Sequence, residues 1–162
     1  MPAKYPTRRS LGAYLTALSA FAIAMGHLEA VVVVYIRHLM DIVPMPEHLT
    51  AEVMAQVPGW LIATEQGREA ATIIMLVTLA WLAGRGPLER VATFLYAFGV
   101  WDITYYVSLK VLLNWPASLQ TTDCLFLIPN PWFAPVWMPV SISAVMIVVA
   151  LMLLAGSRRR VP

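Results

Sequence analysis

The sequence has few charged residues and a single cysteine, and each shortage excludes a class of protein. Charged residues make up 12% of the 162 residues, whereas about a quarter is usual in soluble domains. The composition therefore argues against a soluble protein. Because Cys124 is the only cysteine, the chain cannot form an internal disulfide. This excludes the quinone-coupled thiol oxidases, which need a cysteine pair.

Apolar residues are abundant instead. They account for 60% of the chain and are concentrated in four long stretches, residues 11–36, 60–84, 91–113 and 136–156. Each exceeds the roughly 20 residues that cross a bilayer core. Lipid offers the backbone no hydrogen-bonding partner, so each stretch is expected to be a helix. The sequence therefore predicts an all-α fold: a polytopic integral membrane protein with a four-transmembrane-helix bundle, in a single domain over residues 1–162.

The basic residues indicate the orientation of this bundle. Most of the 11 basic residues lie at the two ends of the chain and in the turn between the second and third stretches. They are Lys4, Arg8, Arg9, Arg85, Arg90, Arg158, Arg159 and Arg160. Since cytoplasmic segments collect Lys and Arg, the N- and C-termini are predicted to be cytoplasmic, in a multi-pass protein of the inner membrane. Topology accounts for the positive charge, so no nucleic-acid partner is expected.

The first stretch also begins like a signal peptide, with basic residues followed by an apolar run. That run continues to Ile36, beyond the candidate cleavage point after residue 24, which favours a retained helix.

The two predicted outer loops, residues 37–59 and 114–135, differ in character. In the first, Pro46 is a favourable helix start, and the spacing of Leu49, Val53 and Val57 predicts a short surface helix. The second loop is apolar but contains four prolines, so it cannot be a fifth span. It is expected at the membrane interface, with aromatic side chains at the level of the lipid head groups. These aromatic residues are Trp115, Trp132 and Trp137.

Five ionisable residues fall at similar depth in the outer half of the predicted bilayer, given a rise of about 1.5 Å per helical residue. They are Glu29, Glu65, Arg68, Glu69 and Asp102. An ionised group in hydrocarbon costs at least about 2.5 kcal/mol, and such groups usually mark a site or a pathway. The sequence therefore predicts an acid-rich polar site, with candidate catalytic residues Glu29, Glu69, Asp102 and Arg68.

Helical spacing shows which of these side chains share a face. One face of the second helix carries Glu65, Arg68, Glu69 and Thr72, and one face of the third carries Asp102, Tyr105 and Tyr106. On the first helix, His27 and Glu29 are about 200° apart around the axis, so both cannot face one spot. Glu29 is predicted to face the second and third helices, with His27 in a supporting or interhelical contact. The candidate ligand-binding residues are His27, Glu65, Tyr105 and Tyr106.

Arg68 is the only strong base at the depth of four acids, which predicts surplus negative charge. Protonation, a bound cation, or Arg37 and Lys110 reaching in from the outer rim would each relieve it. A single metal ion held by ligands from among Glu29, Glu65, Glu69 and His27 is one candidate.

Other cofactors are disfavoured by the sequence. It has no Glu-x-x-His pair for a di-iron centre. His27 and His38 share one helix, so a bis-histidine haem is not expected. The sequence identifies no cofactor.

Some scattered features resemble the emopamil-binding, sterol-isomerase type of four-helix membrane protein. These are His27 and Glu29 on one helix, then "REAAT" and "GRGPLE", then Asp102 with its following tyrosines. The resemblance implies acids that shuttle protons and stabilise a carbocation in a lipid-facing pocket. The spacing of His27 and Glu29 differs from that family's pattern, and the last apolar stretch contains no asparagine.

The predicted function is to bind or process a lipophilic small molecule or a cation at the acid-rich site. The alternatives are an accessory subunit of a larger membrane complex, a membrane-embedded acid/base enzyme of the isomerase kind, and a proton- or cation-coupled carrier. The sequence does not decide whether the protein is an enzyme. Below Asp102 on the third stretch only Thr93 and Tyr96 are polar, which argues against a monomeric carrier. The expected partners are the lipid bilayer and either another membrane protein or a second copy of this chain, because the first helix has a stripe of small residues.

Overall fold

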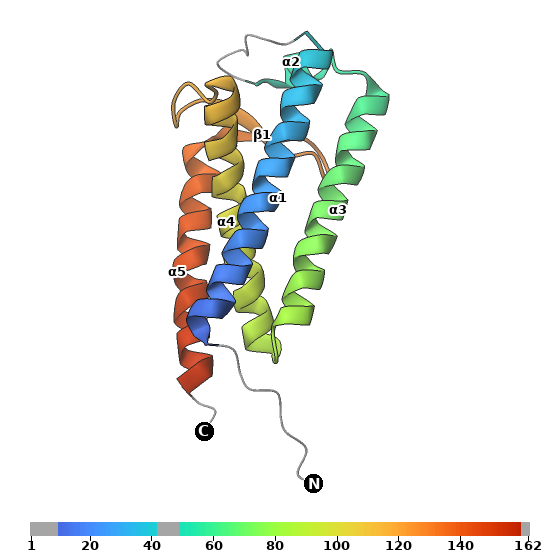
Figure 1. Cartoon of the computed structure of the whole chain (residues 1–162). Helices are drawn as coiled ribbons and strands as arrows, with labels where there is room; N and C mark the ends of the chain where they lie inside the picture. Colours follow the sequence, from blue (N-terminus) through green and yellow to red (C-terminus); the bar gives the residue numbers. More distant parts are fainter. Residues whose placement is uncertain (1–9, 42–48, 160–162) are drawn as a thin grey trace.

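The computed structural model describes residues 10–41 and 49–159, and it is mostly helical, as predicted (Figure 1). The helices are α1 (Leu11–Leu39), α2 (Ala51–Met54), α3 (Gly59–Ala83), α4 (Pro87–Leu113) and α5 (Trp137–Arg159). Two short strands, β1 (Thr122–Phe126) and β2 (Trp132–Pro135), lie between α4 and α5. The all-α prediction is therefore correct for the bundle and wrong for the loop that follows α4.

Helix α4 is at the centre of the bundle and packs against α1, α3 and α5. Two glycines allow the closest approaches. A Cβ atom on Gly26 of α1 would lie 2.5 Å from the carbonyl oxygen of Trp101 on α4, and one on Gly99 of α4 would lie 2.7 Å from that of Ser143 on α5. The absence of these side chains brings the backbones of α1, α4 and α5 together. Helix α3 packs on α4.

The two ends of the bundle are different. The described residues nearest the termini and the α3–α4 turn lie at one end, which we call the terminal end (Figure 1). Helix α2 and the two strands lie at the other, the hairpin end. Three apolar clusters fill the interior between them, with the largest buried aromatic side chains at Tyr14, Trp101, Tyr106 and Trp115.

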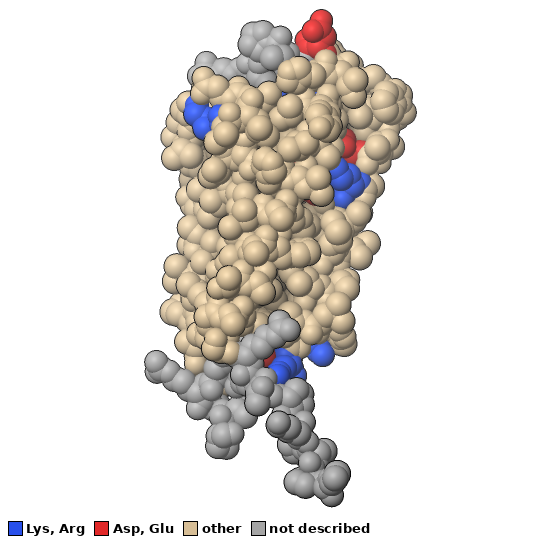
Figure 2. Space-filling model, in the orientation of Figure 1, with Lys and Arg blue, Asp and Glu red and all other residues tan. Residues whose placement is uncertain are grey.

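Two of the helices, α1 and α5, are long and apolar enough to cross a membrane. Helices α3 and α4 have similar lengths but carry more charged residues, including Glu65, Arg68 and Asp102. On the face shown in Figure 2, charged atoms lie at the two ends and in one patch over α3, and the surface between them is uncharged.

The first connecting loop contains less helix than predicted. Helix α2 is a single turn that follows Thr50, whose hydroxyl accepts a hydrogen bond from the amide of Val53 at 3.4 Å. Leu49 is not part of it, because its amide donates to the carbonyl of Thr122 at 3.0 Å. Val57 also lies beyond the helix. The expected start at Pro46 lies outside the described residues.

The second connecting loop forms an antiparallel hairpin, in which Asp123 pairs with Ala134 and Cys124 with Phe133. This two-stranded hairpin is the part of the chain that departs from the all-α prediction. Trp115 is also not at a surface position, because it is only 4% exposed. Trp132 and Trp137 are each about half exposed.

Candidate functional site

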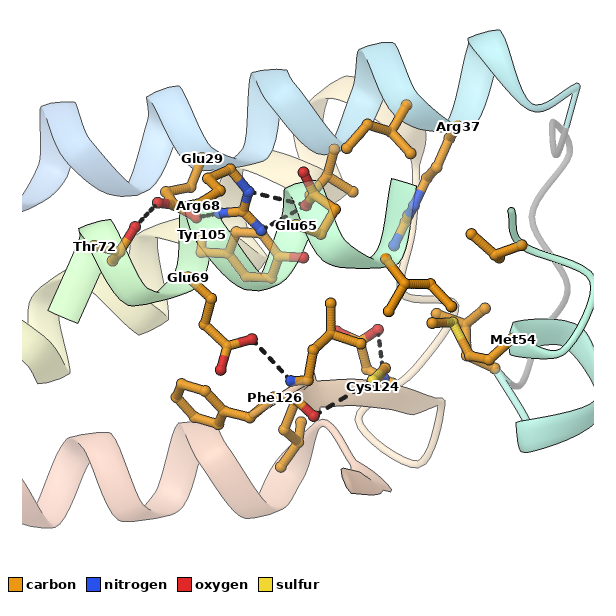
Figure 3. Close-up of a pocket in the computed structure, with 18 of the residues that line it drawn as sticks. Glu29, Arg37, Met54, Glu65, Arg68, Glu69, Thr72, Tyr105, Cys124 and Phe126 are labelled. Carbon is orange, nitrogen blue, oxygen red and sulfur yellow. Dashed lines mark hydrogen bonds and ion pairs between the residues drawn. The ribbon is translucent and has the colours of Figure 1, made fainter. Parts of the chain in front are cut away.

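A cavity of about 200 Å³ lies among α1, α2, α3, α4 and the hairpin, toward the hairpin end (Figure 3). Most of its lining is apolar, with Val33 and Ile36 from α1, Leu61 and Ile62 from α3, and Phe126 from β1. The polar lining residues are Glu29, Arg37, Glu65, Arg68, Glu69, Thr72, Asp102, Tyr105, Tyr106, Asp123 and Cys124. The cavity is thus an apolar space with ionisable groups set into its walls.

Arg68 connects two helices across one wall of this cavity. Its guanidinium forms an ion pair with Glu29 of α1 and a second with Glu65, one turn earlier on α3, at 2.9 Å. The Nε atom of Arg68 also donates to Glu65 at 2.9 Å, so two nitrogens of Arg68 contact the same Oε2 atom. Glu29 accepts a further hydrogen bond from the hydroxyl of Thr72. Both carboxylates near Arg68 therefore have charged partners (Figure 3).

Glu69 points away from Arg68 and toward the hairpin. Its carboxylate accepts hydrogen bonds from the backbone amides of Leu127 at 2.8 Å and Ile128 at 3.3 Å. Gln66, one turn earlier, donates to the carbonyl of Leu127 at 3.2 Å. These contacts attach the end of β1 to α3, which closes the cavity on that side.

The acid on α4 has a partner on α5. Asp102 accepts a hydrogen bond from the hydroxyl of Ser143 at 2.8 Å. Tyr105 also lines the cavity, and its ring packs edge-on against that of Tyr106 with 5.1 Å between ring centroids.

The hairpin contributes an acid that the sequence did not identify as a site residue. Asp123 is 3% exposed and accepts a hydrogen bond from the hydroxyl of Tyr106 at 3.1 Å. Its other oxygen accepts one from the amide of Cys124 at 2.9 Å. Burial raises the pKa of Asp123 to about 6, although the positive charge of Arg37 opposes this rise.

Arg37 lines the cavity near the hairpin end. It is 5% exposed, and its guanidinium lies 4.0 Å from the centroid of the Trp115 ring. Figure 3 shows its side chain extending from α1 into the pocket. Lys110, the other base expected to reach in, turns away from the cavity and donates to the carbonyl of Pro116 at 3.0 Å.

His27 does not line the cavity. Its Nδ1 atom lies 3.3 Å from the hydroxyl of Ser108 on α4, an interhelical contact. Within residues 10–41 and 49–159, no group of three or more His, Cys, Asp or Glu side chains is arranged to hold a metal ion. The proposed ligand set of Glu29, Glu65, Glu69 and His27 is therefore not assembled. His27 and Glu29 diverge around α1, and Glu69 is turned to the hairpin amides.

The structure brings seven of the eight sequence-selected residues to one cavity: Glu29, Glu65, Arg68, Glu69, Asp102, Tyr105 and Tyr106. It adds Arg37, Asp123 and Cys124 to the polar lining. The signal for Asp123 was its place in an apolar loop, where a lone acid needs a partner.

Comparisons of this chain with protein-family models, with curated proteins and with solved structures gave no match.

The chemistry of the site follows from its own residues. The Arg68 guanidinium forms ion pairs with two carboxylates, and the Glu69 carboxylate accepts hydrogen bonds from two backbone amides. Asp102 and Asp123 each accept a hydrogen bond from a side-chain hydroxyl. The polar groups mainly hold the walls together, and the space they enclose suits a small, largely apolar molecule.

Proposed function

We propose that the chain is a multi-pass membrane protein in which α1, α3, α4 and α5 cross the bilayer, with both termini cytoplasmic. Its cavity, in the outer half of that bilayer, binds a small lipophilic molecule. The membrane part of the proposal is supported by α1 and α5, which have the length and apolarity of spans.

The placement of charged residues on α3 and α4 supports the proposal that these two helices also cross the bilayer. At about 1.5 Å per residue, each is long enough for a core of about 30 Å. Glu65, Arg68 and Asp102 line the cavity and satisfy one another or their neighbours. The exposed side chains of α3 include Ile74, which is 64% exposed, and those of α4 include Val111, which is 78% exposed. Apolar side chains in these positions suit contact with lipid.

The single observation that carries the binding proposal is the apolar cavity whose wall carboxylates already have ion-pair or hydrogen-bond partners. An apolar cavity of about 150 Å³ is large enough to bind benzene. At about 200 Å³ this cavity would hold a single ring or a short hydrocarbon chain. Occupation would remove apolar surface from the cavity without breaking the ion pairs of Arg68.

The same partners make a bound cation less favourable than the sequence suggested. A cation would have to compete with Arg68 for Glu29 and Glu65, and with two backbone amides for Glu69. Polar side chains toward the terminal end are also engaged with one another. Tyr14 bonds Thr93 at 2.5 Å, and Ser19 bonds Tyr96 at 2.8 Å. These pairings do not favour a carrier.

Photolabelling in lipid nanodiscs tests the binding proposal. A small aromatic diazirine would be photolysed with the protein, and the labelled residues identified by mass spectrometry. We expect saturable labelling of cavity residues such as Met54, against non-saturable labelling of lipid-facing residues. Ile62→Trp, which fills the cavity, should remove the saturable component. Ile74→Trp, the same change on the exposed face of α3, should leave it intact. Labelling that is non-saturable throughout would overturn the proposal.

A further inference from the structure

The Arg37 guanidinium is a buried charge with an open hydrogen-bonding position. Its Nη1 atom is buried and has no hydrogen-bond partner within residues 10–41 and 49–159. Among the described residues, the ion pairs at the cavity are those of Arg68, and none includes Arg37. An arginine side chain stays protonated in proteins, so this charge cannot be removed by deprotonation.

The contact of Arg37 with Trp115 offsets only part of the free-energy cost of burying the guanidinium. The guanidinium carbon lies 4.0 Å from the ring centroid, within the range of a cation–π interaction. Such a contact uses the face of the guanidinium plane and leaves its N–H groups, which point along the edges, without an acceptor. A buried donor without an acceptor is destabilising, so an acceptor at this position would be bound favourably.

Asp123, which also lines the cavity, does not supply that acceptor. Asp123 interacts electrostatically with Arg37, but one of its oxygens accepts from the Tyr106 hydroxyl and the other from the amide of Cys124. Tyr105 also lines the cavity and interacts electrostatically with both Arg37 and Arg68. The side chain of Arg37 extends from α1 into the pocket and is part of its lining (Figure 3), so a molecule in the cavity would lie beside this side chain.

We propose that Arg37 binds the oxyanion of a small amphiphile, a carboxylate or phosphate group, whose hydrocarbon part lies against Val33, Leu61 and Ile62. This inference rests on the proposed binding function and specifies the class of ligand. The guanidinium fork matches the geometry of both oxyanions, and the apolar walls accept the chain. The anionic end then lies toward the hairpin end, beside Leu49 and Met54, which also line the cavity. The hydrocarbon end is directed toward the middle of the bundle.

The experiment compares octanoate with octanol, which have the same chain length but differ in charge. Binding to the protein in phosphatidylcholine nanodiscs would be measured by calorimetry, with protein-free discs as the blank. We expect the wild-type protein to bind octanoate at least about tenfold more tightly than octanol, as a hydrogen bond to a charged group predicts. Arg37→Gln should remove this preference.

Arg90→Gln is the matched control. Arg90 lies over the ring of Trp81 at 3.6 Å and so repeats the cation–π arrangement, but it does not line the cavity. The Arg90→Gln variant should keep the preference for octanoate over octanol. If Arg37→Gln does not fold, two measurements still test the inference. One is the preference of the wild-type protein for octanoate over octanol. The other is the same preference in Arg37→Lys, which keeps the charge but loses the guanidinium fork.

A second arm asks whether the oxyanion comes from a lipid head group. Nanodiscs containing phosphatidic acid would be used, and the lipid retained on the released protein measured by native mass spectrometry. Retention by the wild type and by Arg90→Gln, with loss in Arg37→Gln, would support a phosphate head group as the ligand. Equal binding of octanoate and octanol, with lipid retention independent of Arg37, would overturn the inference and leave the cavity as a neutral site. If neither octanoate nor octanol bound and no lipid were retained, both the inference and the proposed function would fail.

Discussion

The guanidinium of Arg68 on α3 forms an ion pair with the carboxylate of Glu29 on α1, while Thr72 donates a hydrogen bond to the same carboxylate. This relationship joins two helices that both line the cavity (Figure 3). It also explains why Glu29, in a run of apolar residues on α1, is 7% exposed and directed inward. The pair therefore holds the wall of the cavity in place.

Arg68→Leu should destabilise the protein by about 3–5 kcal/mol, because it leaves the buried Glu29 and the partly buried Glu65 without their shared partner. Unfolding in mixed micelles of increasing dodecyl sulfate content would measure this loss. Arg90→Leu, which changes a residue outside the cavity, should lower the stability by less. Wild-type stability in Arg68→Leu would contradict the buried ion-pair cluster.

Glu69→Ala should release the end of β1 from α3. The amides of Leu127 and Ile128 would lose their acceptor, so their hydrogen exchange should become faster while that of mid-α4 is unchanged. Exchange measured by mass spectrometry on peptides covering residues 124–130 tests this. Glu52→Ala, at an exposed position of α2, is the control. Unchanged exchange in Glu69→Ala would show that the carboxylate does not hold the hairpin.

Asp123 predicts a pH dependence of stability with a definite sign. Burial raises its pKa from the ordinary value of 3.8 to about 6, so between these values the folded state binds more protons than the unfolded state. This contribution therefore makes the protein less stable as the pH rises from 4 to 7. Over this pH range, the unfolding temperature should fall less in Asp123→Asn than in the wild type. The same pH dependence in both proteins would contradict the assignment.

The proposed topology predicts which positions a membrane-impermeant thiol reagent can reach in intact cells. In a Cys124→Ser background, Thr50→Cys should react and Gly86→Cys should be protected until the cells are opened. An added Cβ at Gly86 meets no atom within 4 Å, so the substitution fits the structure. The native Cys124 should react slowly at neutral pH even in the purified protein, because burial raises its thiol pKa to about 12. The reverse labelling pattern would invert the orientation.

Much of the helical part of the site could be predicted because it depends on local periodicity. The spacing of Glu65, Arg68 and Glu69 is a property of one helix and needs no tertiary information. The divergence of His27 and Glu29 follows from the same geometry, and the structure has them contacting different helices. What periodicity could not give was each acid's partner. Glu69 pairs with the hairpin amides and not with Arg68.

The hairpin was missed because the four prolines of this loop were used only to exclude a fifth membrane-spanning helix. Pro129 and Pro131 instead lie in the turn between β1 and β2, and Pro135 is the last residue of β2, where a missing amide is tolerated. Once the hairpin folds back, it buries Asp123 beside Tyr106. Burial of Arg37 against Trp115 likewise depends on contacts between distant segments, which no local pattern reports.

Native mass spectrometry of the protein released directly from its own membranes tests the central claim most directly. The account predicts a wild-type population that carries an additional small mass, its loss in Ile62→Trp, and its retention in Ile74→Trp. Identical spectra for the three proteins, or no bound mass in any of them, would contradict the claim that this cavity is a binding site.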